Sequence, residues 1–335
     1  MIPPDSPIKD LPTNLDVIAA RKRLSGVAIM TPLLNAPQID ESAGRRVWVK
    51  AESLQRTGSF KFRGAWNRLT ALKETGDAGR GVVAFSSGNH AQAVAFSAQR
   101  LGIEAVIIMP ADAPDAKITT TRDYGAKVVL YDRATEDREA IGRKIQNESG
   151  AVLVPPFDDP FIIAGQGTSG AELAEQIAAY ESDPLDLLVC CAGGGLASGI
   201  SLAIEDQKPR MRVRSVEPAG FDDFARSLVT GEHVSNEQQS GSIQDALLTP
   251  RPGFKTFALA QSRFGPGLAV TDEEALRAMA LAWRWLRLVL EPGGAAALAA
   301  ALFRRDAIEG DAVAVIASGG NVDPARFAEA LATLD

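Results

Sequence analysis

Lys61 is the residue whose surroundings first suggest chemistry. It lies in the segment TGSFKFRGA (57–65), which is rich in small residues and carries one other charged side chain, Arg63. A lysine acts as a nucleophile or general base only as the free amine, and burial beside an apolar residue such as Phe60 lowers a lysine pKa by desolvation. Taken alone, the segment favours a solvated lysine at the start of a helix.

A run of glycines, Ala192-Gly193-Gly194-Gly195-Leu196, lies between an apolar stretch and a helical one. Consecutive glycines let backbone N–H groups turn towards an anion, and a helix N-terminus adds a favourable dipole, so a phosphate is the natural ligand. A tight turn that needs glycine for packing is the structural alternative. A dinucleotide-binding site in which Glu217 binds the ribose is a further alternative. It is weaker because the glycines do not follow the G-x-G-x-x-G spacing.

The elements that must position these loops alternate between β-branched runs and Ala-rich helical stretches. This alternation predicts an α/β fold whose parallel sheets are covered by helices on both faces. The segments SSGNHAQAVA (86–95), AGGGLASGI (192–200) and SGGN (318–321) each follow a predicted strand, and ligands gather at that edge of such sheets. We therefore expect these loops and Lys61 to meet in one crevice. The predicted strands are 47–50, 82–85, 105–109, 127–131, 187–191, 213–217 and 312–317.

Composition excludes several classes of partner. The 335 residues carry a net charge of −7 with no block of like charge, so neither nucleic acid nor a membrane is expected. The start of the chain lacks the apolar core of a signal peptide. The adjacent Cys190 and Cys191 are expected to be small buried hydrophobic residues in a reducing compartment. A cytoplasmic protein with a small-molecule substrate is the expectation.

With its motifs taken together, the sequence resembles the fold-type II pyridoxal-phosphate enzymes, in the threonine dehydratase and serine racemase branch. The resemblance covers essentially the whole chain and implies a two-domain, tryptophan synthase β-like fold. Residues 1–76 and 158–335 would form the large cofactor-binding domain, and residues 77–157 the small mobile domain. The matching segments are SFKFRGA (59–65), SSGNHAQAVA (86–95), AGQGT (164–168), AGGGLASGI (192–200), EPGGAAALAA (291–300) and SGGN (318–321).

The resemblance implies a role for each cofactor-binding residue. Lys61 would form the Schiff base with pyridoxal 5'-phosphate and act as the general base, with Phe60 against the pyridine ring. Asn89 would bind the ring hydroxyl, and Ser318 would face the pyridine nitrogen. The backbone of Ala192, Gly193, Gly194, Gly195 and Leu196 would hold the phosphate. The neutral hydroxyl of Ser318 would stabilise a protonated pyridine nitrogen less than a carboxylate would. The cofactor would then withdraw electrons less strongly, which favours loss of a β-substituent over a long-lived carbanion.

The resemblance also implies substrate and metal residues. Ser86, Ser87, Gly88, Asn89 and His90 would receive the substrate carboxylate at a helix N-terminus, and Arg138 could reach the substrate. Ser87 would stand opposite Lys61 as a second catalytic base in a racemase; a plain helix N-cap is the alternative. Carboxylates of Glu217 and Asp223 with the Phe221 carbonyl would suit Mg²⁺ or Ca²⁺, although a charged loop with a helix N-cap explains them equally well.

The implied function is an ammonia-lyase (dehydratase) that converts a 3-hydroxy amino acid, most simply L-threonine or L-serine, to a 2-oxo acid and ammonia. A 3-hydroxyaspartate dehydratase, a serine racemase and a catalytically silent amino-acid-binding protein are the alternatives. The sequence ends soon after SGGN, so we expect no regulatory C-terminal domain and no isoleucine feedback. A homodimer is expected, with the segment around Trp283 and Trp285 in the core or at the interface.

Overall fold

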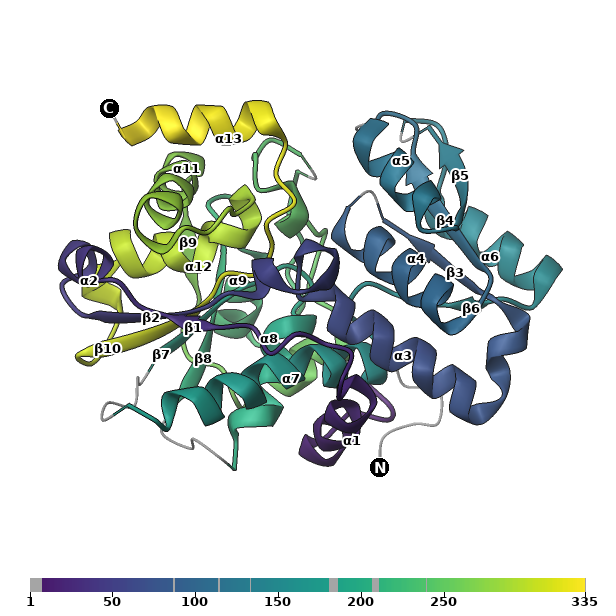
Figure 1. Ribbon diagram of the computed structural model, residues 1–335, viewed down its shortest axis with the longest axis horizontal. Helices are drawn as coiled ribbons and strands as arrows, with labels where there is room; N and C mark the ends of the chain where they lie inside the picture. The colour runs from purple at the N-terminus through teal and green to yellow at the C-terminus, as the bar shows by residue number, and fades with distance from the viewer. Residues whose placement is uncertain are drawn as a thin grey trace.

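The strands of the chain form two sheets (Figure 1). A computed structural model describes residues 8–334, apart from residues 87, 114, 133, 181–185, 207–210 and 239. Within these residues, the larger sheet has six strands and the smaller has four, and β1–β2 is the one antiparallel pair. The larger sheet runs β1 (Leu33–Leu34), β2 (Arg46–Lys50), β10 (Ala312–Ile316), β7 (Asp186–Cys190), β8 (Arg212–Pro218), β9 (Leu268–Val270). The smaller runs β5 (Lys127–Tyr131), β4 (Ala105–Pro110), β3 (Val82–Phe85), β6 (Val152–Leu153).

The strands follow the sequence pattern closely. Every residue of β7 and β10 is buried, as expected for central parallel strands with helices on both faces. All seven strands predicted from the sequence are present. The three missed strands, β1, β6 and β9, are two or three residues long and lie at sheet edges. The predicted α/β fold class is confirmed.

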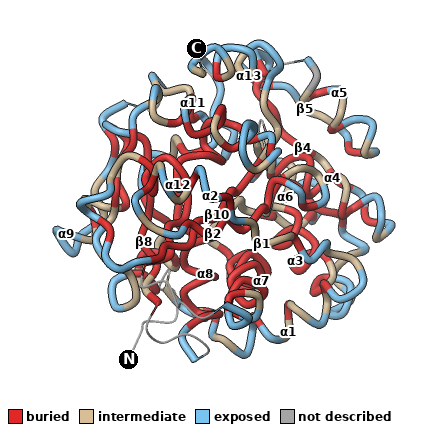
Figure 2. The backbone as a smooth tube through the Cα atoms, turned by 60° about the vertical axis from the view of Figure 1, so that its left-hand side comes forward, coloured by how far each residue is buried: buried red, intermediate tan, exposed pale blue. Residues whose placement is uncertain are grey.

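Helices cover both sheets, and the interior of the molecule lies between the helices and the sheets. Helices α7 and α8 pack closely against each other and are largely buried, while α1 and α13 lie at the outside (Figure 2). The helices are α1 (Asn14–Leu24), α2 (Pro37–Ala43), α3 (Lys61–Thr75), α4 (Asn89–Leu101), α5 (Asp115–Asp123), α6 (Arg138–Ser149), α7 (Pro160–Ile177), α8 (Gly195–Ile204), α9 (Asp223–Thr230), α10 (Phe254–Ala260), α11 (Asp272–Leu281), α12 (Pro292–Phe303) and α13 (Pro324–Leu331).

Local sequence signals set the helix boundaries near the site. Helix α4 ends at Gly102, as predicted, because this residue adopts a left-handed conformation with φ of 69°. Helix α3 begins at Lys61 itself and ends in the same way at Gly76. In the part of the chain that the structure describes, no helix has the length and apolar character needed to cross a membrane.

The strands of the smaller sheet all fall between residues 82 and 153, and together with α4, α5 and α6 they form the right-hand lobe of Figure 1. This grouping supports the expected small domain. The boundaries at 76/77 and 157/158, and the mobility of that domain, stay predictions.

Candidate active site

Lys61 is held at the start of α3 by the loops around it. Its Nζ donates a hydrogen bond to the carbonyl of Pro156 at 2.7 Å and lies 5.1 Å from the centre of the Phe60 ring. The Phe60 N–H donates to the carbonyl of Ser318 at 3.1 Å, which ties the lysine segment to the loop after β10. Burial lowers the pKa of Lys61 to about 8, and the nearby Glu291 carboxylate opposes this shift.

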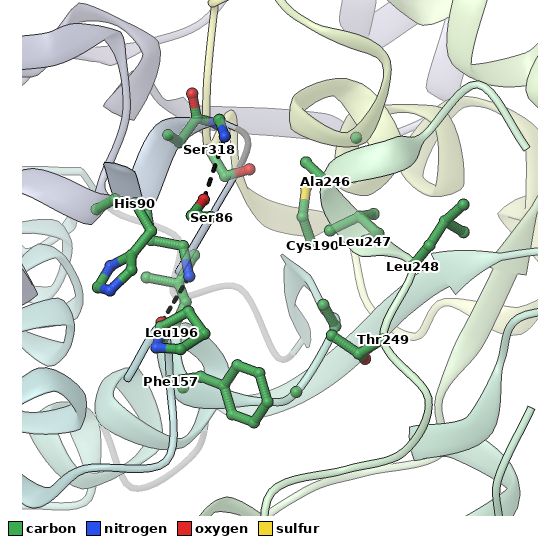
Figure 3. Close-up of a pocket in the computed structure, with 18 of the residues that line it drawn as sticks. Ser86, His90, Phe157, Cys190, Leu196, Ala246, Leu247, Leu248, Thr249 and Ser318 are labelled. Carbon is green, nitrogen blue, oxygen red and sulfur yellow. Dashed lines mark hydrogen bonds between the residues drawn. The ribbon is translucent and has the colours of Figure 1, made fainter. Parts of the chain in front are cut away.

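One pocket contains Lys61 and the predicted cofactor and substrate residues that the structure describes. Figure 3 shows Ser86 and His90 on one side of this pocket and residues 246–249 on the other. The strand-to-helix loops therefore do meet in one crevice, as the sequence predicted. Ser87 lies outside the described residues. The predicted residues that line the pocket are Phe60, Lys61, Ser86, Gly88, Asn89, His90, Arg138, Ala192, Gly193, Gly194, Gly195, Leu196 and Ser318.

The glycine loop is tightly packed, as its structural interpretation predicted, and its phosphate-binding role stays a prediction. Gly194 has a φ of 90°, and a Cβ there would overlap the Phe224 ring. A Cβ on Gly193 would overlap the Phe157 ring, so packing alone requires glycine at both positions. Helix α8 begins at Gly195, and the first turn of a helix leaves N–H groups free to bind an anion. The loop can thus pack tightly and still hold a phosphate.

Asn89 and Glu291 form a hydrogen-bonded pair beside Lys61. Asn89 Nδ2 donates to Glu291 Oε1 at 2.5 Å, and Asn321 Nδ2 donates to Asn89 Oδ1 at 2.7 Å. Burial raises the pKa of Glu291 to about 7, although the Asn89 hydrogen bond opposes this shift. The carboxyl group is therefore poised to hold or release a proton near neutral pH.

His90 positions the loop that begins α4. Its Nε2 lies 2.9 Å from the carbonyl oxygen of Val154, and burial lowers the pKa of His90 to about 3. The ring is therefore neutral, with the proton on Nε2 donated to Val154 and a bare acceptor at Nδ1. Such a ring cannot donate a hydrogen bond to the substrate carboxylate. The predicted role of His90 in binding that carboxylate is therefore limited to its backbone N–H.

Two further cations lie at the pocket. Arg138 is the first residue of α6, and its guanidinium lies 5.2 Å from the centre of the Phe85 ring. Lys117, on α5, lines the same pocket, and its Nζ lies 3.9 Å from Oδ2 of Asp245. Sequence reasoning identified Arg138 but missed Lys117 and Asp245, because neither stands in a recognisable motif.

Cys190 and Cys191 are free and buried, as the sequence predicted. They also line the pocket, which was not foreseen. The sulfur of Cys190 lies 3.5 Å from the carbonyl oxygen of Ile316, at the end of the neighbouring strand β10. The ends of β7 and β10 thus form one wall of the site.

The predicted metal residues are not among the residues that line this pocket. Glu217 accepts N–H groups of Phe224 and Ala225, both at 2.8 Å, so it caps the start of α9. Asp223 accepts from Asn236 through Oδ1, while its Oδ2 is buried without a partner among the described residues. Burial raises the pKa of both carboxyl groups, that of Asp223 to about 7. No group of three or more acidic, histidine or cysteine side chains suited to a metal occurs among the described residues.

Comparison with known proteins gives the class of this fold and site. A family model described as pyridoxal-phosphate dependent enzyme matches residues 24–319. An L-threo-3-hydroxyaspartate ammonia-lyase from Pseudomonas sp. is 43% identical over 317 residues, covering 94% of this chain and 97% of the relative. A serine racemase from Schizosaccharomyces pombe is 40% identical over 322 residues, covering 96% and 98%. The crystal structure of a threonine deaminase from T.th. superposes with a TM-score of 0.87 at 40% identity, covering 93% and 99%.

The chain belongs to the pyridoxal-phosphate dependent enzyme family. The site fits the cofactor: a lysine with a lowered pKa, a helix N-terminus preceded by glycines, and the side chains of Asn89 and Ser318 line one pocket. Its fold is that of the fold-type II members, and the relatives compared include ammonia-lyases and a racemase.

Proposed function

We propose that this enzyme is an ammonia-lyase whose preferred substrate is 3-hydroxyaspartate, which it converts to oxaloacetate and ammonia. The observation that carries the proposal is the presence of Lys117 and Arg138 at the pocket in addition to Lys61. A second substrate carboxylate needs such cations, whereas the methyl group of threonine gains nothing from them. The relative from Pseudomonas sp. named above carries this activity in its name.

The pocket offers separate places for the two carboxylates. The first turn of α4, which begins at Asn89, leaves backbone N–H groups free for the α-carboxylate. Lys117 lies beside this turn, since a Cβ on Gly88 would be 3.9 Å from its Nζ. The second carboxylate would then lie between Lys117 and Arg138.

The chain's own residues supply proton transfer and orientation. When bound, pyridoxal phosphate supplies the electron sink for bonds broken at the α-carbon. Lys61, whose pKa is lowered to about 8, exists partly as free amine near neutral pH and can take the α-proton. Glu291 and Asn89 orient groups beside it. The net reaction removes the α-proton and the β-hydroxyl, and hydrolysis gives the 2-oxo acid and ammonia.

L-Threonine or L-serine dehydration, the preference drawn from sequence, is the second candidate. It draws support from the solved threonine deaminase and from Asp245, which offsets part of the positive charge at the pocket. Racemisation depends on Ser87, which lies outside the described residues.

Ammonia release from purified enzyme tests the proposal. We expect kcat/KM for threo-3-hydroxyaspartate to exceed that for L-threonine by at least about tenfold, which corresponds to one good charge-assisted contact. The erythro diastereomer and L-serine complete the panel, and Lys61→Ala should be inactive on all four. A preference for threonine would overturn the substrate, and activity in Lys61→Ala would overturn the role of the lysine.

A divalent cation at Glu217, Asp223 and the Phe221 carbonyl remains part of the proposal. The unpartnered buried Oδ2 of Asp223 supports it, because a buried carboxylate oxygen without a donor is a position that a cation would satisfy. Addition of Ca²⁺ or Mg²⁺ should raise the melting temperature of the enzyme and leave that of Asp223→Asn unchanged. An equal response of the two proteins would argue against the site.

A homodimer is also proposed, and the exposed tryptophans support it. Trp283 and Trp285 are 40% and 37% exposed, so the core position considered from the sequence is wrong and an interface remains. Light scattering of the purified enzyme gives the assembly state. Cytoplasmic localisation stays a prediction.

A further inference from the structure

An ion pair spans the pocket between elements that are distant in sequence. Lys117 lies on α5, which packs against α4 and β5 of the smaller sheet. Asp245 opens the short helix η4 (Asp245–Leu247), which packs against α12 beside the larger sheet. Their charged atoms are 3.9 Å apart, and both residues line the pocket. The pair is therefore positioned where a substrate would contact it.

The segment that carries Asp245 is anchored by contacts with the starts of α11 and α12. Ser242 Oγ donates to Asp272 Oδ1 at 2.6 Å, and the Ile243 N–H donates to Asp272 Oδ2 at 3.1 Å. Leu247 packs against the start of α12, where a Cβ on Gly293 would lie 3.1 Å from it. The backbone of η4 is thus anchored, while the Asp245 side chain is free to project towards the pocket.

The ion pair itself is weak and replaceable. The side chains of Lys117 and Asp245 are 23% and 66% exposed, and 3.9 Å is long for a charge-assisted contact. Among the described residues, this contact is the one ion pair or hydrogen bond of either charged group, although the charges of both also act on Glu291 in the same pocket. A carboxylate arriving at hydrogen-bond distance can therefore displace Asp245 from Lys117.

We propose that Asp245 is a specificity-determining residue that competes with the second carboxylate of a dicarboxylic substrate for Lys117. The inference rests on the proposed function in that this carboxylate is assigned to Lys117. A dicarboxylic amino acid must displace Asp245 before it gains the Lys117 contact. A substrate with one carboxylate leaves the pair intact and is bound without that cost. Asp245 thereby limits how far the pocket favours dicarboxylic over monocarboxylic ligands.

Binding of non-reacting acids to the holoenzyme tests this competition directly. Succinate serves as the dicarboxylic probe and propionate as the monocarboxylic probe, with dissociation constants read from the absorption of the bound cofactor. In Asp245→Asn, we expect succinate to bind about three- to tenfold more tightly because Lys117 is no longer neutralised. Propionate should change less than about twofold. Glu273→Gln, which removes one charge from the exposed face of α11, is the matched control and should alter neither constant.

A double-mutant cycle separates competition for Lys117 from general repulsion of anions. In the Lys117→Gln background, the effect of Asp245→Asn on succinate should vanish. If the effect persists there, or if propionate gains as much as succinate, Asp245 acts only as a repelling charge and the proposal is wrong. A loss of kcat on every substrate without a change in succinate binding would instead identify a proton-transfer role.

The two proposals can fail independently. If succinate behaves as expected while threo-3-hydroxyaspartate is not consumed, the substrate assignment is wrong and the competition at Lys117 stands. If hydroxyaspartate is consumed and the cycle shows no coupling, the substrate assignment stands and the role of Asp245 is overturned.

Discussion

At the residue scale, the site pairs an amine and a carboxyl group whose pKa values are moved towards neutrality. Burial lowers the pKa of Lys61 to about 8 and raises that of Glu291 to about 7. Each group opposes the shift of the other through its charge. The consequence is a lysine that is a competent nucleophile near physiological pH, beside a carboxyl group able to exchange protons there.

The pH dependence of cofactor capture reports this lysine. In apoenzyme mixed with pyridoxal phosphate, the rate of capture should rise about tenfold per pH unit up to about pH 8 and then level off, since only the free amine reacts. Glu291→Gln should move the plateau to lower pH, because the carboxylate that raises the lysine pKa is gone. The rate is followed as the growth of visible absorption. A rate that continues to rise towards pH 10 would contradict burial of the amine.

At the element scale, the sequence predicted the strands and the loops that meet at the pocket because both depend on local pattern. β7 and β10 are continuous apolar runs, and the loops after them are marked by glycine and serine. The short edge strands escaped prediction because two or three residues show no periodicity. Lys117 and Asp245 escaped because a contact between distant surface-like residues leaves no trace in one sequence.

Another unforeseen feature braces the glycine loop. Asp158 accepts the N–H groups of Phe254, Lys255 and Thr256, so its carboxylate caps the start of α10. Thr256 in turn donates through Oγ1 to the carbonyl of Gly193 at 2.5 Å. The cap therefore links the chain segment that precedes α7 to the predicted phosphate site.

Asp158→Ala should weaken cofactor binding more than it weakens the fold. Loss of the cap is expected to cost about 1 kcal/mol of unfolding free energy, and the loosened glycine loop should lower cofactor affinity about tenfold. Asp323→Ala removes the corresponding cap of α13, where Asp323 accepts the N–H of Ala325, and should cost similar stability with unchanged cofactor affinity. Denaturant unfolding and cofactor titration measure the two quantities. Equal affinity losses in both variants would rule out a specific link.

At the scale of the whole molecule, a buried charge network joins parts of the chain that are distant in sequence. Arg63 donates to Glu52 at 2.7 and 2.8 Å and to Glu172 at 2.7 and 2.8 Å, and all three side chains are buried. Lys50 Nζ donates to Glu172 at 2.7 Å. The network connects β2, the short helix η1 (Glu52–Leu54), α3 and α7. It thereby fixes α3, whose first residue is Lys61, to the larger sheet.

Removing Arg63 should therefore destabilise the molecule strongly. Arg63→Leu leaves buried carboxylates without their main partner and is expected to lower the unfolding free energy by about 3–5 kcal/mol. The matched control is Arg21→Leu, which breaks a pair with Glu175 whose side chains are 34% and 48% exposed, and should cost at most about 1 kcal/mol. Arg63→Lys keeps the charge but loses the planar fork that reaches four oxygens, so its cost should fall between the two. Urea unfolding of the four proteins gives the ranking. A loss for Arg63→Leu no larger than that for Arg21→Leu would mean that packing of α3 against α7 and α4, and not the buried charges, holds the lysine in place.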